Sequence, residues 1–176
     1  TPVGAGLGGG SSNGTMFLRA LNAFLKFPLS HETLCSLAAK LGSDCTLFCY
    51  NEPTIISGRG EIVTPANSEI QKQLKARRLL IFKPHFKIST PWAYKALAEN
   101  KNYCTPEAVK DLNCQLLKGN LPYLNSMESV VFEQYPFLKE LQLKLLKAFN
   151  FHARLSGSGS SFFGFLGKSH KLQEIR

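Results

Sequence analysis

The chain has 176 residues, of which 44% are hydrophobic and 19% charged, so it has the composition of a globular protein with one domain or two small ones and not of a disordered segment. No apolar run approaches the roughly 20 residues of a membrane-spanning helix, and no signal or transit peptide is recognisable, so we expect neither a membrane protein nor a secreted one. The 21 Lys and Arg against 12 Asp and Glu give a net charge of +9, which favours an anionic partner without distinguishing nucleic acid from a phosphorylated metabolite.

A glycine-rich loop comes first in the chain and leads into a helical pattern. The loop occupies residues 4–10, and the apolar residues after it recur with the spacing of one helix face. Ser11 or Ser12 is a suitable N-cap, so the pattern predicts a helix over residues 12–27 that Pro28 terminates.

The next segment predicts a short helix followed by strands. Ser30 is expected to cap a helix that ends at Gly42. Residues 54–57 and 61–64 predict a hairpin around a Gly-Arg-Gly turn, and residues 79–82 form a further β-rich run.

The second half of the chain predicts helices mixed with strands. Helices are expected to begin at Thr90, Thr105 and Pro136, because a proline at the first helical turn is well tolerated. Two short strands are expected over residues 152–155 and 161–165, on either side of a Ser-Gly-Ser-Gly-Ser turn. The expected fold class is therefore α+β, with helices packed on a small antiparallel sheet.

The glycine-rich loop carries the strongest functional signal. Glycine lets main-chain N–H groups turn toward a bound anion, and a helix N-terminus directly after the loop adds favourable electrostatics. The loop therefore predicts a phosphate-binding site. It also matches the Gly-x-Gly-x-x-Gly pattern of dinucleotide-binding folds, but Glu32, the acidic residue about 20 positions on, falls in a predicted helix. No Lys follows the glycines, which excludes a P-loop.

The sequence favours neither a metal centre nor nucleic acid as a partner. Five cysteines without a Cys-x-x-Cys pair, together with scattered histidines, predict reduced thiols and no metal site. The tightest basic cluster, over residues 72–78, lacks the interleaved aromatic side chains of a nucleic-acid platform, so we expect a solvated surface there.

Several segments resemble the GHMP kinases, the superfamily of galactokinase and of homoserine, mevalonate and phosphomevalonate kinases. Residues 2–13, Pro-Val-Gly-Ala-Gly-Leu-Gly-Gly-Gly-Ser-Ser-Asn, resemble their ATP-phosphate loop and are most similar to the 4-diphosphocytidyl-2-C-methyl-D-erythritol kinase branch. Residues 41–48 resemble that branch's Gly-Ala-Asp-Val-Pro-Phe-Phe motif, and residues 155–159 resemble its C-terminal Thr-Gly-Thr/Ser-Gly motif. The segments 58–61 and 89–94 also fit, so the resemblance covers most of the chain.

The resemblance implies a fold, a reaction and a location. The fold would be the GHMP kinase fold, with residues 1–61 as the rest of an N-terminal nucleotide-binding domain and 62–176 as a C-terminal, ferredoxin-like α+β domain that binds substrate. The reaction would be transfer of the ATP γ-phosphoryl group, with Mg²⁺, to the 2-hydroxyl of 4-diphosphocytidyl-2-C-methyl-D-erythritol in cytoplasmic, non-mevalonate isoprenoid biosynthesis. The family's first motif, Lys-Ile/Leu-Asn, does not occur in this sequence. We therefore expect the chain to lack the N-terminal part of such an enzyme, and its activity alone depends on that part being dispensable.

The resemblance also implies roles for single residues. Asp44 would be the catalytic base, with a helix-capping role as the alternative. The ATP-phosphate-binding residues would be Gly4, Gly6, Leu7, Gly8, Gly9, Gly10, Ser11, Ser12 and Asn13. The substrate-binding residues would be Thr90, Pro91, Tyr94, Ser156, Gly157, Ser158 and Gly159. The Tyr94 ring would stack on the cytosine or face the core, and the turn over residues 156–161 would close over the phosphate loop or be an ordinary glycine hairpin.

Other functions remain open at this point. Homoserine or mevalonate kinase activity is the near alternative within the superfamily. A non-catalytic nucleotide- or polyanion-binding module, or a catalytically inert fragment, is the alternative outside it. The sequence does not fix the oligomeric state.

Overall fold

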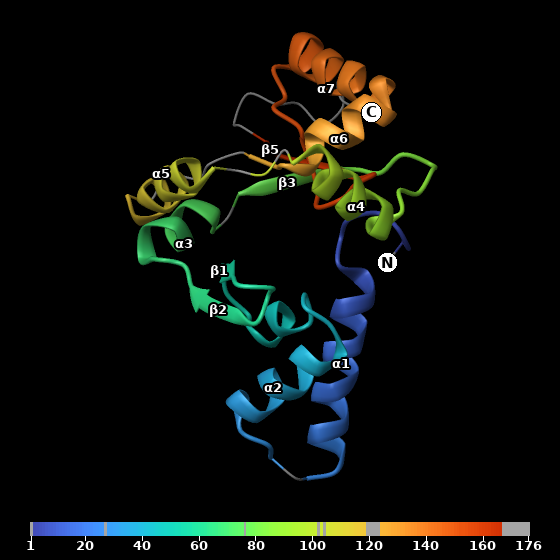
Figure 1. Ribbon diagram of the computed structural model, residues 1–176. Helices are drawn as coiled ribbons and strands as arrows, with labels where there is room; N and C mark the ends of the chain where they lie inside the picture. Colours follow the sequence, from blue (N-terminus) through green and yellow to red (C-terminus); the bar gives the residue numbers. More distant parts are fainter. Residues whose placement is uncertain are drawn as a thin grey trace. The chain divides into compact units, whose positions relative to one another are not determined.

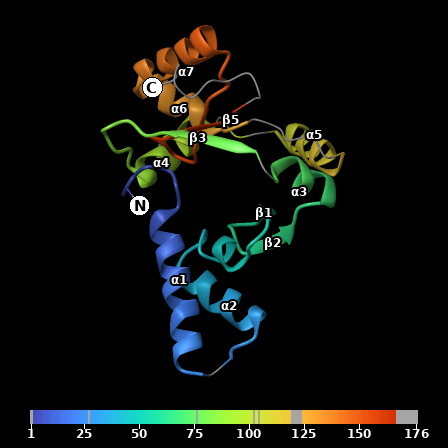
Figure 2. The same ribbon diagram turned by 180° about the vertical axis from the view of Figure 1, so that it is seen from behind.

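The structure, a computed structural model, separates into two compact units, and each is described by itself (Figures 1 and 2). The residues described are 2–26, 28–75, 77–101, 103, 105–118 and 124–166. The first unit is Gly8–Leu74, and the second combines Pro2–Leu7 with the described residues from Lys75 to Leu166. Within the described ranges, no helix has both the length and the hydropathy needed to span a bilayer.

The first unit contains helices and one hairpin. Its elements in chain order are α1 (Gly9–Phe24), α2 (His31–Leu41), the 3₁₀ helix η1 (Thr46–Cys49), β1 (Thr54–Ser57), β2 (Ile62–Pro65) and α3 (Ser68–Leu74). α2 packs beside α1, and η1 contacts both (Figure 1). The buried residues Ala38, Cys45 and Cys49 form the small core between these helices.

The start of α1 differs from the sequence-based expectation. Gly8 is the N-cap, in the left-handed conformation with φ of 62°, and its carbonyl accepts the first helical bond from Ser12 N at 2.8 Å. Ser11 and Ser12 were expected to cap the helix but lie inside its first turn. The prediction was wrong because glycine reaches a positive φ at no steric cost, so the helix begins before the serines. The helix ends at Phe24, ahead of Pro28, while Phe27 lies outside the described residues.

The predictions for α2 and the hairpin are confirmed. The Ser30 hydroxyl accepts from Thr33 N at 3.2 Å, and Gly42 is the C-cap of α2. β1 and β2 pair antiparallel, with Ile55 opposite Thr64. The domain boundary predicted between residues 61 and 62 falls inside this hairpin, and the structure divides after α3, a helix that the sequence analysis missed. The assignment of functional domains stays a prediction.

The second unit is an α+β layer structure, as expected. Its elements are β3 (Arg78–Phe82), α4 (Thr90–Asn100), α5 (Pro106–Leu117), α6 (Met127–Gln134), α7 (Pro136–Phe149), β4 (Arg154–Leu155) and β5 (Phe162–Leu166). The described strands form one antiparallel sheet in the order β3-β5-β4, and α6 and α7 lie on one side of it in both views (Figures 1 and 2). The predicted helix starts at Thr90 and Pro136 are confirmed. The helix expected from Thr105 begins one residue later, with Thr105 as its N-cap, and α6 was missed.

The core of the second unit lies between the sheet and the helices. Ile88, Leu138, Phe151, Leu155 and Phe162 are each at most 1% exposed. A side chain at residue 164 in β5 would overlap the Phe151 ring, which explains the glycine there. Burying apolar side chains of this size contributes roughly 1.5–3 kcal/mol each, so this core anchors the strands on either side of the Ser-Gly turn.

Candidate functional site

The N-terminus of α1 has the features of an anion site. By helix geometry, the N–H groups of Gly9, Gly10 and Ser11 have no acceptor within the helix. A Cβ added at Gly10 would meet no heavy atom within 4 Å, so the space beside this turn is open. Together with the positive end of the helix dipole, these free donors fit a phosphate group.

The same end of α1 packs against η1 within the first unit. A Cβ at Gly8 would lie 2.9 Å from Phe48 Cζ, so only a glycine permits this close approach. Phe48 belongs to the segment that resembles the family's Asp motif. The phosphate-loop end of α1 and the chain just after Asp44 are therefore in direct contact.

Asp44 lies in the exposed turn between α2 and η1. Two neighbours hold this turn. The buried Thr15 hydroxyl of α1 donates to Cys45 O at 2.8 Å, and Gly60 of the hairpin turn approaches the Ser43 backbone too closely for any side chain. Cys45 is the N-cap residue of η1, so Asp44 does not have the helix-capping role that was its alternative. Its carboxylate makes no hydrogen bond or ion pair with the described residues, so it can accept a proton from a ligand.

The cysteines beneath this turn are not placed for nucleophilic chemistry. Cys45 and Cys49 are buried, and burial raises the pKa of the Cys49 thiol to about 11. Because the thiolate is the nucleophile, a thiol with such a raised pKa is inert at neutral pH. Asp44 is therefore the better candidate for chemistry in this part of the first unit.

In the second unit, the turn over residues 156–161 binds the first half of the glycine-rich loop. Ser156 Oγ donates to Gly6 O at 2.7 Å, and Ser161 N donates to Ala5 O at 3.1 Å. Gly6 has φ of 72°, and a Cβ there would overlap Ser156 O. The turn joins β4 to β5 as a glycine hairpin does, and it also contacts residues 5 and 6. Its role in binding substrate stays a prediction.

The start of α4 meets the same turn. Thr90 Oγ1 and Ser158 Oγ are 3.0 Å apart and share a hydrogen bond. Pro91 is exposed in the first helical turn, and Tyr94 is 61% exposed one turn later. The core-facing alternative for Tyr94 is therefore wrong, and its ring is free to stack on a planar ligand.

The predicted site residues fall on both units. Asp44 and the loop from Gly8 to Asn13 belong to the first unit. The second unit contains Gly4, Gly6, Leu7, the start of α4 and the Ser156–Gly159 turn. Among the described residues, no group of three or more His, Cys, Asp or Glu side chains could hold a metal ion.

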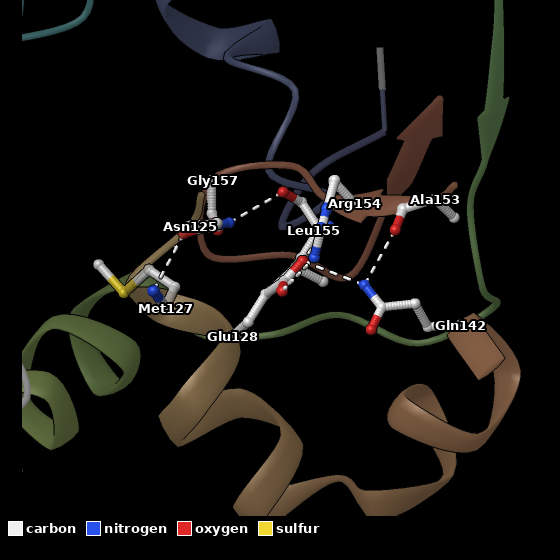
Figure 3. Close-up of polar contacts among 8 residues, drawn as sticks. All are labelled: Asn125, Met127, Glu128, Gln142, Ala153, Arg154, Leu155 and Gly157. Carbon is white, nitrogen blue, oxygen red and sulfur yellow. Dashed lines mark hydrogen bonds and ion pairs between the residues drawn. The ribbon is translucent and has the colours of Figure 1, made fainter. Parts of the chain in front are cut away.

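The sequence analysis missed Asn125, whose side chain forms hydrogen bonds with the backbone of the Ser-Gly turn (Figure 3). Its Nδ2 donates to Leu155 O and to Gly157 O, both at 2.8 Å, and its Oδ1 accepts from Met127 N at 3.0 Å. A local signal was available, because Asn125 precedes Glu128 by three residues, a spacing that marks helix N-termini. That spacing predicts the start of α6, although not the bonds to the distant turn.

The known proteins that this chain resembles are kinases. The family model described as GHMP kinases N terminal domain matches residues 1–52. The chain is 39% identical to 4-diphosphocytidyl-2-C-methyl-D-erythritol kinase of Thermodesulfovibrio yellowstonii, over 98% of the chain and 62% of that protein. It is 41% identical to the protein of the same name from Nitratidesulfovibrio vulgaris, over 92% of the chain and 57% of that protein.

A solved structure gives the same result. The crystal structure of a 4-(cytidine 5'-diphospho)-2C-methyl-D-erythritol kinase matches with a TM-score of 0.71 and 31% identity, over 99% of the chain and 62% of that protein. The chain thus has the GHMP kinase fold, and it spans about three fifths of the length of the curated relatives that it matches.

Proposed function

We propose that this chain belongs to the GHMP kinase family and acts in an ATP-dependent kinase whose substrate is 4-diphosphocytidyl-2-C-methyl-D-erythritol. One observation carries the proposal. Within the first unit, the open N-terminal turn of α1 packs through Gly8 on Phe48, four residues after the exposed and unpaired Asp44. Phosphoryl transfer needs little more of a protein than a phosphate cradle and a base that are held together.

The proposed reaction is a direct transfer. The glycine-rich loop, from Gly4 to Asn13, binds the ATP phosphates through its free N–H groups. The acceptor hydroxyl oxygen forms a bond to the γ-phosphorus while the bond from that phosphorus to the bridging oxygen of ADP breaks, and Asp44 takes the hydroxyl proton. The turn that carries Asp44 is fixed by Thr15 and Gly60, so the backbone on either side of Asp44 is held in position before the substrate arrives.

Mg²⁺ fits this site as an ion carried by the nucleotide. The described residues contain no cluster of three protein ligands, and Mg²⁺ at phosphates typically keeps its waters and uses only one or two carboxylates. When bound, it would neutralise charge on the transferred phosphoryl group. The contribution of this chain is the loop that holds the phosphates.

Recognition of the substrate is assigned to the second unit. The exposed Tyr94 ring would stack on the cytosine, beside Thr90 and Pro91, and residues 156–159 would contact the acceptor end. Residues 1–61 would be the remaining nucleotide-binding domain and residues 62–176 the substrate-binding domain. The proposed setting is the cytoplasm and non-mevalonate isoprenoid biosynthesis.

The test is an assay on the full-length natural protein in which this sequence occurs. The protein is incubated with Mg-ATP and 4-diphosphocytidyl-2-C-methyl-D-erythritol, and phosphorus NMR follows ADP and a new phosphomonoester. Mevalonate and homoserine serve as control acceptors. Phosphorylation of either control in place of the cytidine substrate would contradict the assigned branch. No transfer, with binding to phosphocellulose that falls steeply with salt, would favour the polyanion-binding alternative.

A further inference from the structure

Both the nitrogen and the oxygen of the Asn125 side-chain amide form hydrogen bonds. The two Nδ2 hydrogens go to Leu155 O and Gly157 O, on either side of Ser156, while Oδ1 accepts from Met127 N in the first turn of α6 (Figure 3). Among side chains this short, only an amide offers two donors and one acceptor. Asn125 thus ties the start of a helix to a turn that lies about thirty residues further along the chain.

A second set of polar contacts fixes the strand that enters this turn. Glu128 Oε1 accepts from Leu155 N at 2.9 Å and from Gln142 Nε2 at 3.3 Å, and Glu128 Oε2 pairs with Arg154 Nη1 at 3.5 Å. Gln142 also donates to Ala153 O at 2.9 Å. With β4 held in this way, Asn125 reaches past the strand to Gly157 in the turn itself, where Thr90 contacts Ser158.

The Ser156–Gly159 turn fixes the backbone of the glycine-rich loop. Ser156 Oγ donates to Gly6 O at 2.7 Å, Ser161 N donates to Ala5 O at 3.1 Å, and Gly159 N donates to Ser156 O at 2.9 Å. The carbonyls of residues 5 and 6 are therefore directed toward the turn. Because a peptide unit is planar, fixing a carbonyl also fixes the direction of the N–H on the following residue.

We propose that Asn125 is a positioning residue for nucleotide binding, which acts by holding the Ser156–Gly159 turn against the Gly4–Leu7 part of the glycine-rich loop. The inference rests on the proposed kinase function. Asn125 touches neither of the assigned reacting groups. It acts through the turn, and its loss leaves the loop backbone free to adopt other orientations.

Asn125→Asp separates this role from the bond that Asn125 makes to the start of α6. Asp keeps an oxygen for Met127 N, so that bond is retained. It has no donors for the Leu155 and Gly157 carbonyls, and its carboxylate would face two carbonyl oxygens. Val131→Ala is the matched control, because Val131 is buried in the same helix and its truncation lowers stability without removing a hydrogen bond to the turn.

The experiment measures kcat and the KM for ATP of the full-length protein at a temperature where melting curves show both variants folded. Asn125→Asp is expected to raise the KM for ATP about tenfold or more, whereas Val131→Ala leaves it within about twofold of the wild type. Equal KM values for the two variants at equal loss of melting temperature would overturn the proposal, since the role would then be only structural.

Amide exchange gives a second measurement that needs no enzymatic activity. In Asn125→Asp, the N–H groups of Ser161 and Ile88, which donate to Ala5 O and Gly4 O, should exchange at least about tenfold faster relative to the most protected amides of β5. Unchanged exchange at both residues would overturn the proposal. A wild-type protein without kinase activity would refute the proposed function, while faster exchange at both residues would still support the positioning of the loop by Asn125.

Discussion

Replacing Gly6 by Ala tests whether the glycine-rich loop is locked against the Ser156–Gly159 turn. Gly6 has φ of 72°, and a Cβ there would overlap Ser156 O and lie 2.9 Å from Gly159 N and 3.0 Å from Gly159 O. All of these neighbours are backbone atoms, so no flexible side chain can move aside. The substitution therefore strains the residue and also displaces the turn.

The size of the effect follows from these two contributions. An L-residue in the left-handed region costs roughly 1–2 kcal/mol, and forcing a backbone shift in a packed region costs typically about 1–3 kcal/mol. We expect Gly6→Ala to lower the free energy of unfolding of the second unit by about 2–5 kcal/mol, a sum of the two. At roughly 2–4 °C per kcal/mol, the melting temperature should fall by about 4–20 °C.

Trp92 fluorescence is the appropriate assay, because this single tryptophan lies in α4 of the second unit. Gly14→Ala is the control. Gly14 lies within α1 of the first unit, where an added Cβ would meet only Leu41 Cδ1 at 3.9 Å, so Ala should stabilise that helix by up to about 1 kcal/mol and leave the Trp92 transition unchanged. A Gly6→Ala variant that melts at the wild-type temperature would refute the reasoning.

Two further predictions concern the first unit, and a third compares a cysteine of each unit. Thr15→Val removes the 2.8 Å hydrogen bond to Cys45 O, although this carbonyl still accepts from Phe48 N. The free energy of unfolding in urea should therefore fall by about 1 kcal/mol. A loss below the error of the measurement would contradict the assigned role. Burial raises the pKa of Cys49 from its ordinary value near 9 to about 11, so the folded state favours the protonated thiol. Its contribution to stability should be full below about pH 9 and should be lost as the pH rises toward about 11. Urea unfolding across this range should show the decline, and Cys49→Ser should reduce it; an unchanged slope would refute the assignment. Iodoacetamide at neutral pH should label the exposed Cys114 well before Cys49.

Local sequence patterns predicted those elements whose ends are set by local chemistry. Ser30 and Gly42 bound α2 as expected, because a side-chain oxygen at one end and a glycine at the other satisfy the terminal groups of a helix. The hairpin around Gly58 and Gly60 followed from a turn that needs positive φ. The phosphate loop was predicted from its glycines and the helix that follows them, whereas the candidate base Asp44 came from motif resemblance, and the structure adds the contacts that hold both segments.

Contacts between distant segments were not predictable in the same way. The choice of Gly8 over Ser11 or Ser12 as the α1 cap depends on a backbone conformation that also brings Gly8 against Phe48. The role of Asn125 depends on bonds to Leu155 and Gly157, which no local pattern encodes. Residues that position a site through tertiary contacts carry little local signal, and this is why the role of Asn125 was missed. The start of α6 itself was signalled by the spacing of Asn125 and Glu128, which the sequence analysis overlooked.

The most direct test of the proposed mechanism is to measure kcat and the dissociation constant of ATP for Asp44→Asn in the full-length protein. The substitution keeps the size of the side chain but removes the carboxylate that accepts the hydroxyl proton, so kcat should fall by roughly 10²–10⁴-fold. Because the Asp44 carboxylate makes no bond to the described residues, the affinity for ATP should stay within about twofold of the wild type. Transfer at the wild-type rate would contradict the assignment of Asp44 as the base.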